Sequence, residues 1–267
     1  MKNSYALVTG ASSGLGRDFA ILLAGAGYNL VLTARREERL MDLKRELSET
    51  TKSKVEIIAM DLTASNAAEH LYQETRKRGL EVEVLINNAG YGIYGMFEDI
   101  AWEREAQMIQ LDMVALTHLT KLYSKDMAAR GKGYILLISS IGAYQATPTY
   151  AAYAAAKSYV LHLGEALNFE MASRGVKISV LSPGITATEF LQVSGQETTL
   201  YQRLAMMQSR PVAEIGLKAM FKGKPSVVPG ILNKLSAFSI RFIPRRLATY
   251  MSYLLMRNNE QSAAKPV

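Results

Sequence analysis

The sequence predicts an α/β fold in which helices cover both faces of a doubly wound parallel sheet. Strand-like apolar runs alternate with helical stretches from the N-terminus onward. The runs are almost continuously apolar, as in strands buried on both faces, and a glycine-rich turn follows the first of them. The 267 residues, 49% of them hydrophobic, contain no Pro/Gly/Ser-rich linker, so one large domain is favoured over two.

The expected elements follow one another in a βαβα order. The strand-like runs are residues 5–9, 29–33, 55–59, 82–86, 134–138 and 176–181. The helical stretches lie near residues 15–26, 36–50 and 65–78, and a further helix begins near Tyr150. In such a sheet, ligands bind beyond the carboxyl ends of the strands, where the strand order reverses.

Charge is unevenly distributed along a chain whose net charge is +7. Residues 1–214 hold 22 Lys and Arg against 23 Asp and Glu, whereas residues 215–267 hold 9 against 1. An excess confined to one end argues against a nucleic-acid-binding body, and no motif of a nucleic-acid-reading module is present.

Cysteine and histidine usage limits the chemistry. The chain has no cysteine, which excludes disulfides and thiolate catalysis and suits a reducing compartment. His70, His118 and His162 lie far apart in the sequence, so we expect no metal site. The N-terminus lacks the pattern of a secretory signal, and residues 133–156, the longest run without charge, resemble strand, loop and helix start more than a membrane span. We expect a cytoplasmic protein.

The glycine-rich turn after the first strand is the first candidate binding site. Its candidate cofactor contacts are Gly10, Ser12, Ser13, Gly14, Leu15 and Gly16. Glycines allow close approach of the backbone, and the following helix N-terminus offers unpaired amides to a pyrophosphate. This setting between a strand and a helix favours a Rossmann-type dinucleotide site over a ligand-free tight turn.

Two arginines at the end of the second strand indicate which dinucleotide binds. An acid at this position would bind the 2′-hydroxyl of the adenosine ribose, whereas Arg35 and Arg36 can hold a 2′-phosphate. Glu37 and Glu38 compete with that interpretation, although they also suit the first turn of the next helix. The sequence therefore favours NADP(H) over NAD(H).

Tyr153 and Lys157 lie four residues apart and share one face of the predicted helix. A tyrosine acts as a general acid or base near neutral pH when an adjacent cation favours its phenolate, which Lys157 can supply. By themselves, the two residues also fit an ordinary alanine-rich helix. Tyr150 is a weaker candidate, because Ala154 stands four residues after it.

Together these motifs resemble the short-chain dehydrogenase/reductase family over residues 4–229. The resemblance rests on Thr9 to Gly16, Asp61-Leu62, Asn87-Asn88-Ala89-Gly90, Ser140, the Tyr153/Lys157 pair and Pro183-Gly184. It implies that Asp61 and Leu62 contact the adenine and that Asn88, Ala89 and Gly90 line the cofactor. It also implies nicotinamide contacts from Ile185 and Thr188, which follow Pro183 and Gly184.

The resemblance also implies a catalytic group. Ser140 would hydrogen-bond the substrate oxygen, Tyr153 would exchange a proton with it, and Lys157 would hold the nicotinamide ribose and lower the pKa of Tyr153. Ser139 is the weaker serine candidate, because neighbouring strand residues face opposite sides. Asp112 stands where the family usually has an asparagine, and its charge would stabilise protonated Lys157 and oppose a phenolate. We expect Asp112 to shift the activity optimum to higher pH.

Two segments are candidates for the substrate side. Residues 185–209 resemble the substrate lid of the family, and their aliphatic and Met side chains favour an apolar substrate, although packing on the core is equally compatible. The apolar side chains of this segment are Phe190, Leu191, Leu200, Tyr201, Leu204, Met206 and Met207. Tyr91, Tyr94, Met96 and Phe97 could form another wall.

Beyond the catalytic domain of residues 1–229, we expect a helical extension over residues 230–257 and a flexible tail over residues 258–267. The extension mixes apolar and basic residues, and no acid occurs in it. Packing on the domain or in a homodimer or homotetramer is favoured, with contact to an anionic membrane surface as the alternative.

The sequence as a whole predicts an NADP(H)-dependent carbonyl reductase or alcohol dehydrogenase. Its expected substrate is a small, lipophilic ketone or 3-oxoacyl compound. The alternative is a protein that kept the fold and the cofactor for a regulatory or scaffold role without catalysis.

Overall fold

The computed structural model describes residues 4–196 and 206–257 and confirms the expected α/β fold. Seven parallel strands form the main sheet in the order β3-β2-β1-β4-β5-β6-β9, so the strand order reverses between β1 and β4. The strands are β1 (Tyr5–Thr9), β2 (Asn29–Ala34), β3 (Val55–Ala59), β4 (Val82–Asn87), β5 (Gly133–Ile138), β6 (Val176–Leu181) and β9 (Ser226–Val227). A small parallel pair joins β7 (Thr186–Ala187) to β8 (Met207–Gln208).

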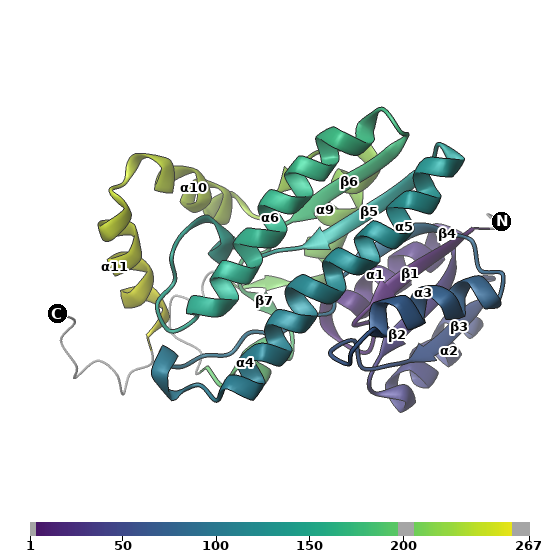
Figure 1. The fold of residues 1–267 in the computed structure, drawn as a ribbon, viewed down its shortest axis with the longest axis horizontal. Coiled ribbons are helices and arrows are strands. Elements are labelled where there is room, and N and C mark those ends of the chain that lie inside the picture. Colours follow the sequence, from purple (N-terminus) through teal and green to yellow (C-terminus); the bar gives the residue numbers. More distant parts are fainter. Residues whose placement is uncertain (1–3, 197–205, 258–267) are drawn as a thin grey trace.

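Helices cover both faces of the main sheet (Figure 1). One face carries α1 (Gly14–Gly25), α2 (Glu37–Thr50) and α9 (Ser209–Lys222), and the other carries α3 (Ala67–Lys77), α5 (Leu116–Arg130) and α6 (Ala151–Ala172). The alternation along β1 shows how one strand serves both layers, since Ala6 and Val8 pack in the first core and Leu7 in the second. The apolar strands are therefore buried on both sides, as the sequence predicts.

An irregular helix brings an acidic residue into the interior. Helix α4 (Trp102–Ile109) continues through a π-helical turn, η2 (Gln110–Ala115), into α5. Such π turns occur mostly as short insertions in α-helices, often at functional sites. This one carries Asp112, whose side chain is fully buried.

Short elements complete the description. The 3₁₀ turns are η1 (Phe97–Asp99), η3 (Ile141–Tyr144) and η4 (Ile240–Phe242). Helix α7 (Phe190–Ser194) lies within the predicted lid, while Leu200, Tyr201 and Leu204 lie outside the described residues. Within the described residues, no helix is long and apolar enough to cross a membrane.

Two helices follow the last strand of the sheet. They are α10 (Ile231–Ser239) and α11 (Arg245–Met256), which lie together at one end of the molecule (Figure 1). Asn233 of α10 packs against Gly184, where an added Cβ would stand 2.4 Å from the Asn233 amide nitrogen. The extension is therefore anchored on the loop that follows β6. The predicted tail, residues 258–267, lies outside the described residues.

Candidate active site

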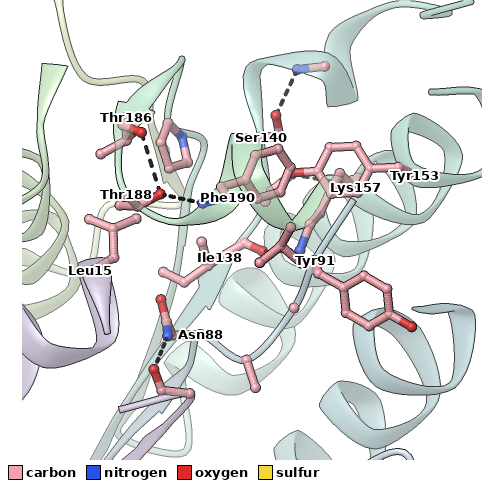
Figure 2. A pocket seen from close by; sticks show the side chains of 18 of the residues that line it. Leu15, Asn88, Tyr91, Ile138, Ser140, Tyr153, Lys157, Thr186, Thr188 and Phe190 are labelled. Atoms are coloured by element: carbon pink, nitrogen blue, oxygen red, sulfur yellow. Dashed lines mark hydrogen bonds between the residues drawn. The ribbon is translucent and has the colours of Figure 1, made fainter. Parts of the chain in front are cut away.

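A cavity of about 440 Å³ opens beyond the carboxyl ends of the central strands (Figure 2). Nearly all of the site residues predicted from the sequence line it. They are Gly10, Ser12, Ser13, Gly14, Leu15, Arg35, Arg36, Asp61, Leu62, Asn88, Ala89, Gly90, Ser140, Tyr153, Lys157, Pro183, Gly184, Ile185 and Thr188. Gly16 and Asp112 are the exceptions, because both stand behind the wall rather than in it. The cavity lies at the reversal of strand order, where doubly wound sheets bind ligands.

The glycine-rich loop forms a cradle that side chains would fill. An added Cβ on Gly16 would stand 2.1 Å from the Gly10 carbonyl oxygen, so α1 can approach the loop this closely only with glycine. Gly14 has a φ of +51° and lies against Thr188, whose Cγ2 would be 2.8 Å from an added Cβ. The Ser13 side chain makes no capping hydrogen bond to α1, which leaves the first amides of the helix for a ligand. These residues fit a dinucleotide pyrophosphate.

Hydrogen bonds lock the neighbouring strand ends together. The amides of Asn88 and Ala89 both donate to the Thr9 hydroxyl at 2.9 Å, and the Asn88 side chain donates to the Thr9 carbonyl at 2.9 Å. The Asp61 carboxylate accepts from the amide and hydroxyl of Thr63, at 2.9 and 2.8 Å. The loops after β1, β3 and β4 thus keep a fixed shape around the cavity.

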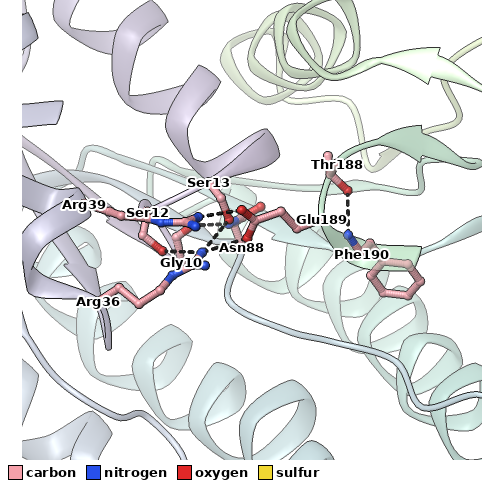
Figure 3. A network of polar contacts seen from close by, with 9 residues as sticks. All are labelled: Gly10, Ser12, Ser13, Arg36, Arg39, Asn88, Thr188, Glu189 and Phe190. Atoms are coloured by element: carbon pink, nitrogen blue, oxygen red, sulfur yellow. Dashed lines mark hydrogen bonds and ion pairs between the residues drawn. The ribbon is translucent and has the colours of Figure 1, made fainter. Parts of the chain in front are cut away.

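Arg36 is the centre of a polar network at the rim (Figure 3). Its guanidinium donates to the hydroxyls of Ser12 and Ser13, at 3.3 and 3.0 Å, and to the Glu189 carboxylate at 3.0 Å. Arg39 donates to the other Glu189 oxygen at 2.5 Å. Two guanidiniums therefore hold one carboxylate beside two serine hydroxyls, and guanidinium pairs of this kind also bind phosphate. The pKa of Glu189 is lowered by the hydrogen bonds from Arg39 and Arg36.

The two acids that competed with Arg36 have a local role. Glu37 and Glu38 occupy the first turn of α2, where negative charge is stabilised by the helix dipole. Neither lines the cavity.

Ser140 and Tyr153 come from different elements and meet at the cavity (Figure 2). Ser140 follows β5, where its hydroxyl accepts the amide of Gly142 at 3.1 Å. The Ser139 hydroxyl instead donates to the Lys157 carbonyl at 2.7 Å, within the contact between β5 and α6. The two adjacent serines thus have different partners, and the Ser140 hydroxyl is the one that lies beside the Tyr153 hydroxyl.

Lys157 is held in a buried ion pair. Its ammonium lies 2.8 Å from Asp112 Oδ2 and donates to the Ile138 carbonyl at 3.1 Å. The other Asp112 oxygen, Oδ1, accepts the Tyr91 amide at 3.2 Å. Burial raises the pKa of Asp112, and the Lys157 ammonium opposes that rise. Gly90 covers the pair, since an added Cβ there would stand 2.8 Å from Asp112 Oδ1.

The environment of Tyr153 differs from the sequence-based expectation. Burial raises the pKa of the Tyr153 hydroxyl well above its usual value, and the Asp112 carboxylate adds to the rise, while a hydrogen bond with Ser140 opposes it. Lys157 lies over the Tyr153 ring, 5.6 Å from its centroid, with its charge directed to Asp112. The expected lowering of the Tyr153 pKa by Lys157 is therefore not realised in this structure.

Comparison with known proteins decides the family. The profile of the short chain dehydrogenase family matches residues 4–199. The chain belongs to the short-chain dehydrogenase family.

Named relatives within the short-chain dehydrogenases act on steroids and fatty acyl chains. The chain is 29% identical to the 17-beta-hydroxysteroid dehydrogenase type 3 of Mus musculus, over 92% of this chain and 83% of that one. It is 34% identical to the very-long-chain 3-oxoacyl-CoA reductase of Pyricularia oryzae, over 67% of this chain but only 55% of the relative. A solved short-chain dehydrogenase from Sphingobium yanoikuyae, in complex with NADPH, superposes with a TM-score of 0.80 at 27% identity and covers 91% of this chain and 97% of that one.

Several residues of this short-chain dehydrogenase line the cavity although the sequence did not single them out for it. The extension contributes Asn233, Ser236, Ile240, Ser252, Leu255 and Met256. The Tyr150 hydroxyl donates to Gln196 Oε1 at 2.9 Å, and the Gln196 amide donates to the Met256 carbonyl at 2.6 Å. Gln196 of the lid thus joins the start of α6 to the end of α11. The mixed apolar and basic pattern indicated helices here but not which of their faces turns toward the cavity.

Glu189 is the other residue that sequence reasoning missed. It follows the predicted nicotinamide contact Thr188, but its partner Arg36 lies 153 positions away. Sequence spacing carries no signal for such a contact.

Proposed function

We propose that this protein is an NADP(H)-dependent oxidoreductase that interconverts a lipophilic carbonyl compound and its alcohol. The observation that carries the proposal is the convergence of Ser140, Tyr153 and Lys157 on one cavity with the glycine-rich loop. Membership of the short-chain dehydrogenases supports oxidoreductase chemistry.

The cofactor would lie along the cavity from the arginines to Tyr153. Arg36, Ser12 and Ser13 offer donors for a 2′-phosphate, and Arg35 lines the cavity beside them. The amides at the start of α1 suit the pyrophosphate, and Thr188 with Ile185 would contact the nicotinamide. The NADPH bound to the Sphingobium yanoikuyae relative supports the phosphorylated form.

The chemistry of the reductive direction follows from the positions of three side chains. When bound, the nicotinamide supplies the hydride that reaches the carbonyl carbon. Ser140 donates a hydrogen bond to the carbonyl oxygen, and the Tyr153 hydroxyl gives that oxygen its proton. Lys157 would bind the nicotinamide ribose, while Asp112 fixes its ammonium. In the oxidative direction Tyr153 receives the proton instead.

The walls of the cavity support a lipophilic substrate. The lining includes Phe190 and Val193 of the lid and Ile240, Leu255 and Met256 of the extension. Apolar walls with few polar groups are typical of sites for hydrophobic ligands. Steroid and long-chain 3-oxoacyl relatives agree with a ketone or a 3-oxoacyl compound.

A panel of carbonyl compounds followed through NADPH absorbance tests the proposal. We expect consumption of NADPH with bulky ketones or 3-oxoacyl thioesters and slower consumption with NADH. Tight NADPH binding without turnover of any compound would favour the regulatory or scaffold alternative. A cytoplasmic location and a homodimer or homotetramer stay part of the proposal, and sedimentation of the purified protein tests the assembly.

A further inference from the structure

Helices α10 and α11 turn their large apolar side chains toward solvent. In α10 these residues recur with helical spacing, as they do in α11, so each helix presents an apolar stripe on its outer side. The exposed stripe, here called the outer face, consists of Ile231, Leu232, Leu235, Phe238, Phe242, Leu247, Tyr250, Met251 and Leu254. Phe238 and Phe242 touch edge to face, with ring centroids 5.4 Å apart, which links α10 to η4.

The inner sides of the same helices carry small or polar residues. Asn233 and Ala237 are the buried residues of α10, and Ala248 and Ser252 are those of α11. A helix on the surface of a soluble protein normally has the opposite arrangement, with large apolar residues inside. The exposed fractions of Ile231 and Phe242, 79% and 75%, show how little the protein covers the outer face. Exposed apolar surface of this extent marks an interaction site.

The segment that carries the outer face also carries exposed basic side chains. Lys234, Arg241, Arg245 and Arg246 are all exposed, and no acid occurs between Glu214 and Glu260. The Arg241 guanidinium lies 5.7 Å from the Phe238 ring centroid, so positive charge stands directly beside apolar surface. An apolar stripe with basic flanks complements anionic lipid headgroups above acyl chains.

We propose that the outer face of α10 and α11 docks this protein on an anionic bilayer surface, with the apolar stripe in the headgroup region and the basic residues on the lipid phosphates. A second copy of the chain fits this face poorly, because two equally basic surfaces would meet in a symmetric contact. The docking does not depend on the proposed hydride transfer.

The position of the outer face relates the bilayer to the cavity. Ser236, Ile240, Ser252 and Leu255 of the same segment line the cavity. A lipid-dissolved substrate would therefore pass only between or beside two helices to reach Tyr153. This geometry gives a lipophilic substrate a short route out of the membrane.

Vesicle flotation of the purified full chain tests the docking. The probes are vesicles of phosphatidylcholine alone and of phosphatidylcholine with phosphatidylglycerol. We expect binding to the anionic vesicles that weakens with added salt, and little binding to the neutral ones. The variants Leu235→Gln/Phe242→Gln and Arg245→Gln/Arg246→Gln should each weaken that binding about tenfold or more.

A matched control distinguishes binding through the outer face from nonspecific binding through any exposed apolar side chain. Phe169, on α6, is 86% exposed and belongs to neither helix of the extension, so Phe169→Gln should bind vesicles like the wild type. Circular dichroism melting of every variant checks that the fold is kept. Undiminished binding by either double variant, or equal binding to neutral vesicles, overturns the proposal. Failure of the wild type to float, with a dimer that Leu235→Gln/Phe242→Gln dissociates, overturns it in favour of a second copy.

Discussion

At the scale of single residues, the pair of Asp112 and Lys157 governs the charge around the proposed acid. The two side chains are almost completely buried and 2.8 Å apart. A buried carboxylate close to Tyr153 opposes formation of a phenolate and takes up the cation that would otherwise favour it. Both effects favour the protonated form of Tyr153.

Asp112→Asn should move the pH dependence of activity to lower pH. The substitution removes a negative charge and releases the Lys157 ammonium, and both changes lower the pKa of Tyr153. Reduction needs the protonated tyrosine. The rate of reduction should therefore begin to fall at a lower pH in the variant than in the wild type. Oxidation needs the phenolate and should begin at lower pH as well. Rate profiles in both directions measure this. Asp42→Asn, an exposed charge loss on α2, is the control, and coincident profiles for wild type and Asp112→Asn would contradict the account.

Glu189→Gln should tighten NADPH binding. The Glu189 carboxylate accepts hydrogen bonds from Arg36 and Arg39, so a 2′-phosphate at Arg36 would have to displace it. Without the carboxylate, NADPH no longer has to break two partly exposed ion pairs, and its 2′-phosphate no longer meets a repulsive charge. We therefore expect a Kd for NADPH that is lower by about two- to tenfold. Fluorescence titration measures the change. The Kd for NADH, which has no 2′-phosphate, should stay the same, and an unchanged Kd for NADPH would show that Glu189 does not compete.

Site residues that belong to a sequence motif can be predicted from the sequence. Residues that contact a motif from a distant part of the sequence are harder to predict. Ser140, Tyr153 and Lys157 stand at fixed spacing on elements whose type is evident, and the structure brings them to one cavity. Glu189 could not be predicted, because its contact with Arg36 depends on how the lid folds back over the first βαβ unit.

At the scale of elements, close packing of α6 on β6 sets the position of Tyr153 and Lys157. Gly164 makes this approach possible, since an added Cβ would stand 2.2 Å from Val180 Cγ2 and 3.0 Å from Leu137 Cδ1. The helix can approach the sheet this closely only without a side chain there.

Gly164→Ala should destabilise the protein by about 1–3 kcal/mol through overpacking between α6 and the sheet. Gly25→Ala is the matched control, because Gly25 ends α1 and has nothing within 4 Å of an added Cβ. Alanine there should be neutral or stabilise by up to about 1 kcal/mol. Urea unfolding of the two variants and the wild type measures both values. Equal stabilities for Gly164→Ala and the wild type would show that the helix can move away at little cost.

Regular elements were predicted more completely than irregular ones. Apolar strands bounded by turns are easily recognised in a sequence. The first six strands lie within one residue of their expected ends. The π-helical turn η2 was not predicted, because one extra residue in a helical turn leaves no mark on periodicity over so short a stretch.

At the scale of the whole molecule, the cavity is assembled from the sheet edge, the lid and the C-terminal extension. The first of these follows from sequence pattern, because parallel strands bring their carboxyl ends to one edge. The placement of α10 and α11 does not, since their amphipathic pattern suits a core, a subunit contact or a lipid surface alike. The packing of Asn233 on Gly184 and the burial of Ala237, Ala248 and Ser252 show which side faces inward.

Tyr153→Phe tests the central claim most directly. The change removes only the hydroxyl to which we assign the proton exchange with the substrate, so kcat for reduction of a carbonyl compound by NADPH should fall by about 10²–10⁴-fold. The Kd for NADPH, measured by fluorescence in the same preparation, should stay within about twofold of the wild-type value. A variant that binds NADPH normally and reduces the carbonyl compound as fast as the wild type would contradict the assignment of Tyr153 as the acid.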